Sequence, residues 1–195
     1  MVSNSSLVRH NLKALKKLDK IDSFYKQLFG KAWLTISVVI AVGLINMLLF
    51  SGLDNNWSGY VILALSIVKI YFIVKLSFDQ LIKIIAQSHL LSHILVLFAL
   101  LIGLILLSFT TDYSALHILD ETNFKNSSGV VSSTSEILFE YLYLSTITFS
   151  SVGYGDIVPV SMVAKTLVML QVALRFFVLV FGIANINNIK IEKYN

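Results

Sequence analysis

The 195-residue sequence has no cysteine, a single proline and few charges, which make up 13% of its residues. Without cysteine the chain forms no disulfide, and it offers no thiolate to bind zinc or to attack a substrate. The scarcity of charge accompanies 56% hydrophobic residues and a mean hydropathy of +0.81, values that exclude an ordinary soluble domain. We therefore expect an integral membrane protein.

The formal net charge of +4 does not indicate a nucleic-acid partner. Basic residues are concentrated before residue 32, where leucine and isoleucine recur at intervals of three and four. This pattern predicts a basic amphipathic segment over residues 1–31 that lies on the cytoplasmic membrane surface, attracted by anionic lipids. A solvated basic arm that only orients the first span explains the same pattern equally well. Membrane lipids are expected partners of the protein, and the first interpretation adds anionic lipid at this segment.

Apolar runs predict four transmembrane helices, at residues 32–50, 59–76, 90–109 and 160–189. The second is the least typical because it contains Lys69, which needs a partner, a water-filled crevice or a tilted helix at membrane depth. Residues 77–88 are expected to form an amphipathic inner connection. The loop after the first run has no basic residue, whereas Lys190 and Lys193 follow the last, so both termini are assigned to the cytoplasm.

Between the third and fourth runs the sequence becomes polar. Residues 110–135 include Asp112 and Asp120 and are expected to form an outer turret loop. Residues 133–136 (Ser-Thr-Ser-Glu) fit a capping box that opens an apolar helix over residues 136–149. We expect this helix to be too short to cross a bilayer. It is predicted to be re-entrant, which is tolerated only where the returning backbone lines a protein cavity.

The most informative motif follows directly, and we call it the candidate filter segment: Ser151-Val152-Gly153-Tyr154-Gly155-Asp156. Glycine at alternate positions permits left-handed dihedrals, so consecutive carbonyls can face one side of the strand. The side chains of Val152 and Tyr154 would then point away and pack behind it. Several such strands around an axis can replace the hydration oxygens of a cation. A simple glycine turn between two transmembrane helices is the alternative.

From residue 89 to 189, the order outer helix, turret, short helix, Ser-Val-Gly-Tyr-Gly-Asp and inner helix resembles the pore module of the potassium channel family, particularly its small prokaryotic members. The resemblance implies an all-α membrane protein with four transmembrane helices, a re-entrant pore helix and a selectivity filter, assembled as a homotetramer. It implies passive, K⁺-selective conduction across the cell membrane, with no cofactor. The chain is then divided into residues 1–31, the two N-terminal spans at 32–88, and the pore module at 89–195.

The resemblance also assigns roles within the candidate filter segment. K⁺ would be bound by the backbone carbonyls of Ser151, Val152, Gly153 and Tyr154. The Ser151 hydroxyl would add a ligand, although the family usually has threonine at this position. Gly155 and Asp156 would form the outer mouth, and Tyr143 would support the Tyr154 ring from behind.

On the inner helix the resemblance places four residues along the pore: Phe176, Leu179, Ile183 and Asn187. A gate near Ile183 and Asn187 would then close by dewetting. The same helical spacing is nearly as typical of ordinary packing on a buried helix face.

Arg175 departs from the family pattern, because many members have a hinge glycine here and Gly182 is the nearest replacement. A guanidinium about 8 Å from an ion in the pore repels it by roughly 2 kcal/mol at an effective dielectric constant of about 20. We therefore expect the side chain to turn away from the axis and to brace the inner helix against carbonyls near Thr148 and Phe149 or against Gln171. An arginine that faces the pore as a cation barrier is the alternative.

Other functions are compatible with parts of the sequence. A potassium uptake subunit usually repeats the pore unit four times per chain and relaxes the filter to one key glycine, and neither feature is present. Arg175 is compatible with a different function, that of an accessory or regulatory membrane subunit with a pore-like fold. A less selective cation channel is disfavoured by Tyr154 and both glycines. No serine has a plausible base and orienting group, so we expect no enzyme.

Overall fold

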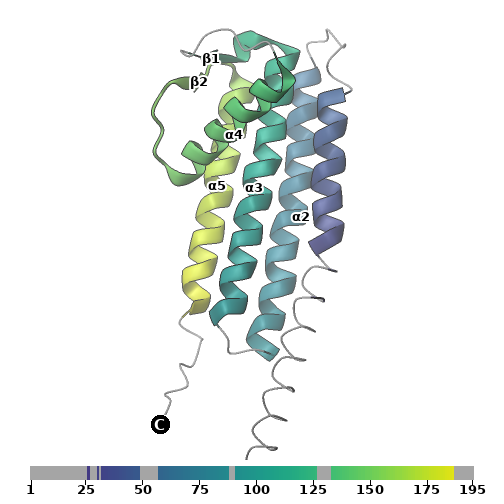
Figure 1. Cartoon of the computed structure of the whole chain (residues 1–195), viewed down its shortest axis with the longest axis vertical. Helices are drawn as coiled ribbons and strands as arrows, with labels where there is room; N and C mark the ends of the chain where they lie inside the picture. Colours follow the sequence, from purple (N-terminus) through teal and green to yellow (C-terminus); the bar gives the residue numbers. More distant parts are fainter. Residues whose placement is uncertain are drawn as a thin grey trace, which may run out of the picture. The chain divides into compact units, whose positions relative to one another are not determined.

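The computed structural model describes residues 26, 30, 32–48, 57–87, 91–126 and 133–186 (Figure 1). The side chains of residues 81–87, 91–94, 181 and 183–186 are not among those described. The chain divides into two units, Met1–Leu34 and Thr35–Asn195. In the first unit the few described residues are helical, and most of the predicted amphipathic segment lies outside the described residues.

Three of the described helices are long and apolar enough to cross a membrane: α2 (Ser58–Gln87), α3 (Leu91–Leu119) and α5 (Met162–Ile186). In the second unit α3 packs against α2, α5 and the shorter helix α4 (Thr134–Ser150). The helix Ala32–Leu48 is apolar but shorter than these spans, and residues 49–56 lie outside the described part. The described residues are thus mostly helical, as the sequence predicts, while a fourth span stays a prediction.

Two helices are longer than the sequence indicates. The second span and the predicted inner connection form one continuous helix, α2. The third span does not end at Phe109 but continues to Leu119, so the expectation that Asp112 belongs to an outer loop is wrong. The polar run is compatible with a helix because two of its hydroxyls bond within it: Thr110 donates to the Leu106 carbonyl at 2.7 Å, and Thr111 donates to the Ser108 carbonyl at 2.8 Å.

A buried ion pair joins α2 to α3 in the interior. Lys69 Nζ lies 2.6 Å from Asp112 Oδ1, and neither side chain has any exposed surface. Lys69 also donates to the Ser108 carbonyl at 3.0 Å, while Asp112 accepts hydrogen bonds from Asn46 Nδ2 at 3.0 Å and Ser66 Oγ at 2.6 Å. Asp112 is therefore the partner that Lys69 needs at membrane depth.

Three short elements flank α4 in the sequence: the 3₁₀ helix η1 (Glu121–Asn123) and the strands β1 (Phe124–Asn126) and β2 (Ile157–Pro159). The two strands pair antiparallel, with Phe124 opposite Pro159. The Asn123 side chain donates to the Leu116 carbonyl at 3.0 Å, and the backbone carbonyl of Asn123 accepts the Val160 N–H at 2.8 Å. This small sheet, which the sequence did not indicate, attaches the chain after the candidate filter segment to the end of α3.

Helix α4 is held in place by a cap at its N-terminus and by aromatic contacts along its middle. Ser133 is its N-cap, and Glu136 accepts a hydrogen bond from the Ser133 N–H at 3.3 Å, so the helix begins where the predicted capping box places it. Tyr141 packs against Phe124 of β1, with ring centroids 4.9 Å apart, and Phe124 in turn packs edge-on against Tyr113 of α3 at 5.8 Å. The aromatic contacts hold α4 against α3.

Candidate functional site

The backbone of the candidate filter segment alternates in handedness. The left-handed dihedrals expected at Gly153 and Gly155 are present, with φ of 57° and 78°. A third positive φ, 59°, occurs at Ser151, the only other described residue in this region of dihedral space. Because every second residue is left-handed, the segment has the alternation that lets successive carbonyls point to one side.

Ser151 adopts its left-handed conformation because it ends α4. Its N–H bonds to the carbonyls of Ile147 and Thr148, and the Val152 N–H reaches back to the Ile147 carbonyl at 3.0 Å. This is the hydrogen-bond pattern of a Schellman-type helix end, usually made by glycine. The candidate filter segment therefore starts directly from the helix, with no intervening loop.

The side chains of the segment are not covered by their own chain. Val152 is 51% exposed and Tyr154 71%, so the predicted packing behind the strand is not made within one chain. Tyr143, which the resemblance places behind the Tyr154 ring, donates a hydrogen bond from its hydroxyl to Asp156 Oδ2 at 2.6 Å. Asp156 Oδ1 also accepts the Ile157 N–H at 3.0 Å. The hydrogen bond from Tyr143 is the main cause that holds the Asp156 pKa below its usual value, so this end of the segment carries a negative charge at neutral pH.

The guanidinium of Arg175 donates a hydrogen bond to the Ser151 hydroxyl. Its partner is therefore neither a carbonyl near the end of α4 nor Gln171, which were the predicted partners. Arg175 Cζ also lies 5.2 Å from the centroid of the Phe176 ring. The Arg175 side chain thus connects α5 to the start of the candidate filter segment. It does so through the Ser151 hydroxyl, to which the resemblance assigns ion binding.

Gln171 makes a separate connection. Its amide donates to the Ser145 carbonyl at 2.9 Å and to the Ser145 hydroxyl at 2.8 Å, and its oxygen accepts from Tyr113 at 2.7 Å. Ser145 in turn donates to the Leu106 carbonyl at 3.0 Å. These bonds join α3, α4 and α5 in the interior, and no local sequence signal identified them.

The predicted pore-lining residues are only partly among those described. Phe176 is 55% exposed and Leu179 39%, whereas Val178 is 1% exposed. The Ile183 side chain and Asn187 lie outside the described residues. Helix α5 continues unbroken through Gly182, where an added Cβ would lie 2.6 Å from Cζ of Phe98. Gly182 therefore allows close packing of α5 on α3.

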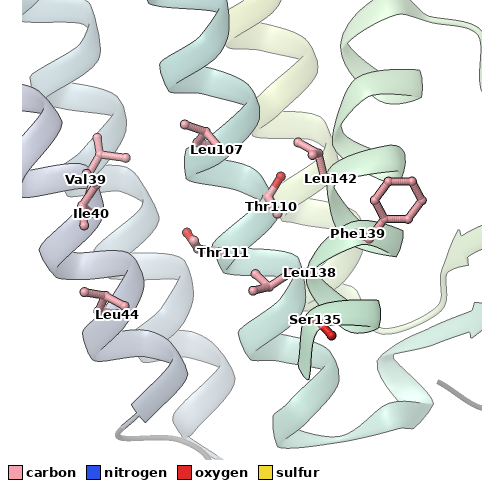
Figure 2. Close-up of a pocket in the computed structure, with 10 residues that line it drawn as sticks. All are labelled: Val39, Ile40, Leu44, Leu107, Thr110, Thr111, Ser135, Leu138, Phe139 and Leu142. Atoms are coloured by element: carbon pink, nitrogen blue, oxygen red, sulfur yellow. The ribbon is translucent and has the colours of Figure 1, made fainter. Parts of the chain in front are cut away.

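A groove of about 440 Å³ lies between the helix Ala32–Leu48, α3 and the start of α4 (Figure 2). Ten residues line it: Val39, Ile40, Leu44, Leu107, Thr110, Thr111, Ser135, Leu138, Phe139 and Leu142. Only the three hydroxyl residues among them are polar. The groove offers no charged group to an ion, and among the described residues there is no cluster of three or more His, Cys, Asp or Glu suited to a metal.

Comparison with known proteins identifies a family. Residues 94–191 match the family described as ion channel, and the match covers nearly all of α3, α4, the candidate filter segment and α5. No curated protein and no solved structure matches the chain significantly. Because the family match extends over half of the chain, the protein belongs to the ion channel family.

Proposed function

We propose that the protein is a potassium-selective channel that conducts K⁺ passively. The observation that carries this proposal is the alternation of left-handed dihedrals at Ser151, Gly153 and Gly155. The carbonyls of Ser151 to Tyr154 can then face the ion path and replace the hydration shell of K⁺. The segment follows α4, which is not among the helices suited to cross a membrane and whose C-terminal dipole end favours a cation.

A homotetramer is part of the proposal, because one chain supplies one filter strand and an ion must be surrounded. The exposed side chains of Val152 and Tyr154 support it, since neighbouring subunits can cover the surfaces that a single chain leaves open. Phe176 and Leu179 of α5, also exposed in the single chain, are proposed to face the pore together with Ile183 and Asn187.

The proposed location is the cell membrane, with both termini in the cytoplasm and residues 1–31 on anionic lipid. The sequence between the first two apolar runs has no basic residue, Trp57 directly precedes α2 and Tyr60 lies in its first turn, which is typical of an outer interface. No cofactor is proposed, and K⁺ is the permeant ion.

Reconstitution of the purified protein into liposomes tests this function. We expect downhill K⁺ flux that greatly exceeds Na⁺ flux. Gly153→Ala should abolish the flux or the selectivity, because a Cβ is strained at a positive φ even though no atom lies within 4 Å of it. Gly103→Ala is the matched control, because this helical glycine also has no atom within 4 Å and its φ is not positive.

Other results would favour other functions. Equal K⁺ and Na⁺ flux would indicate a less selective cation channel. An absence of flux from correctly assembled protein would indicate an accessory or regulatory subunit. Unchanged selectivity in Gly153→Ala would show that the candidate filter segment does not select the ion.

A further inference from the structure

The two ends of the candidate filter segment hold opposite charges. At one end the Asp156 carboxylate is held by the hydroxyl of Tyr143 and by the Ile157 N–H. At the other end the guanidinium of Arg175 is bonded to the Ser151 hydroxyl. In the proposed topology, each subunit therefore places an anion at the outer end of the ion path and a cation at the inner end.

The charge of Arg175 is not paired with an acidic side chain in the described part of the chain. Its contacts are neutral: the Ser151 hydroxyl and the Phe176 ring, 5.2 Å from Cζ to the ring centroid. A cation–π contact fixes the position of a guanidinium without removing its charge. The Ser151 oxygen also becomes a poorer ligand for K⁺, because a hydrogen bond from a cation occupies one of its two lone pairs and places a positive charge beside it.

We propose that Arg175 makes the channel rectify, so that K⁺ flows inward more readily than outward. Fixed charge at a pore mouth changes the local concentration of the permeant ion. The carboxylates of Asp156 concentrate K⁺ at the outer mouth, whereas the guanidinium groups of Arg175 dilute it at the inner mouth. Entry from the cytoplasm is then slower than entry from outside. This inference rests on the proposed function and concerns the direction of the same ion flow.

Screening by salt gives the proposal a test that needs no substitution. The Debye length falls from about 10 Å at roughly 0.1 M salt to about 3 Å at roughly 1 M. If fixed charge at the two mouths causes the asymmetry, the ratio of inward to outward current approaches one as symmetrical KCl is raised over this range. Rectification caused by the shape of the pore would not depend on salt in this way.

The experiment records currents of the full-length protein in inside-out patches, with symmetrical KCl free of divalent cations and polyamines. At equal and opposite voltages we expect the inward current of the wild type to exceed the outward current several-fold. Arg175→Gln should raise the outward current and bring the ratio close to one, while Arg175→Lys, which keeps the charge, should retain most of the asymmetry. Lys165→Gln is the control for the loss of a positive charge: Lys165 lies at the opposite end of α5, on the outer side in the proposed topology, so its replacement should not bring the ratio closer to one.

A K⁺-selective current that is linear in the wild type would overturn this inference and leave the proposed function intact. The same conclusion would follow if the ratio did not change with salt. A failure of Arg175→Gln to assemble would not prevent the test, because the salt series uses the wild type alone. The absence of any K⁺-selective current in the wild type would contradict the proposed function itself.

Discussion

Lys69 and Asp112 are 43 residues apart in the sequence, and their charged atoms lie 2.6 Å apart in the interior of the helices. Two other side chains, Asn46 and Ser66, also bond to the carboxylate. A charge that loses its partner in such a place costs far more than a surface charge, because neither water nor another polar group replaces the lost contact. The pair therefore joins α2 to the channel-family region within the second unit.

The first prediction concerns this ion pair. Lys69→Met leaves the Asp112 carboxylate buried without its cation and should destabilise the protein by about 3–5 kcal/mol. Thermal unfolding in detergent, followed by circular dichroism, measures the loss as a lower midpoint. Lys75→Met is the control, because Lys75 lies on the same helix but is exposed, and its replacement should cost no more than about 0.5 kcal/mol.

The double variant Lys69→Met with Asp112→Asn removes both charges and keeps one amide oxygen as an acceptor for Asn46 or Ser66. It should regain much of the stability that Lys69→Met loses, because no unpaired charge stays buried. If the stability lost in the double variant equalled the sum of the losses in Lys69→Met and Asp112→Asn, the two charges would not be coupled and this prediction would be wrong.

The second prediction separates packing from hinge bending at Gly182. A Cβ at this position would lie 2.6 Å from the Phe98 ring, so Gly182→Ala should destabilise the protein by about 1–3 kcal/mol through overpacking. Phe98→Leu in the same chain should relieve the clash and restore part of the loss. Gly103→Ala, with no atom within 4 Å, is expected to stabilise the protein by roughly 0.4–1 kcal/mol. If Gly182 were a hinge, Gly182→Ala would alter gating without changing stability, and Phe98→Leu would not reverse the effect.

The third prediction concerns acid at the outer mouth. The Tyr143 hydrogen bond holds the Asp156 pKa below its usual value, so the carboxylate stays charged until the external pH falls through that lowered pKa. Inward current should therefore decline only at a pH below the ordinary range of aspartate. Tyr143→Phe removes the donor and raises the pKa, so the decline should begin at a higher pH than in the wild type.

Inward current is measured as a function of external pH in the wild type and in Tyr143→Phe, which tests the direction of the predicted shift. Tyr71→Phe, an exposed tyrosine on α2, serves as the control and should leave the pH profile unchanged. A midpoint that stays in place or moves to lower pH in Tyr143→Phe would show that the hydrogen bond does not control the charge of Asp156.

Features that depend on a few consecutive residues could be predicted from the sequence. The apolar runs indicated helices at α2, α3 and α5 because the length of a span is a local property. The start of α4 at Ser133 and Glu136 and the positive φ at Gly153 and Gly155 also follow from local sterics and hydrogen bonding. The resemblance to ion channels rested on this same local motif.

Features that depend on side chains from different helices were decided only by the tertiary structure. The need of Lys69 for a partner was visible in the sequence, but Asp112 became that partner only because α2 and α3 pack side by side. Likewise, Arg175 bonds to Ser151 and not to Gln171, since Gln171 is already held by Tyr113 and Ser145. A polar side chain at membrane depth must find a hydrogen-bond partner, and helix packing determines which partner lies within reach.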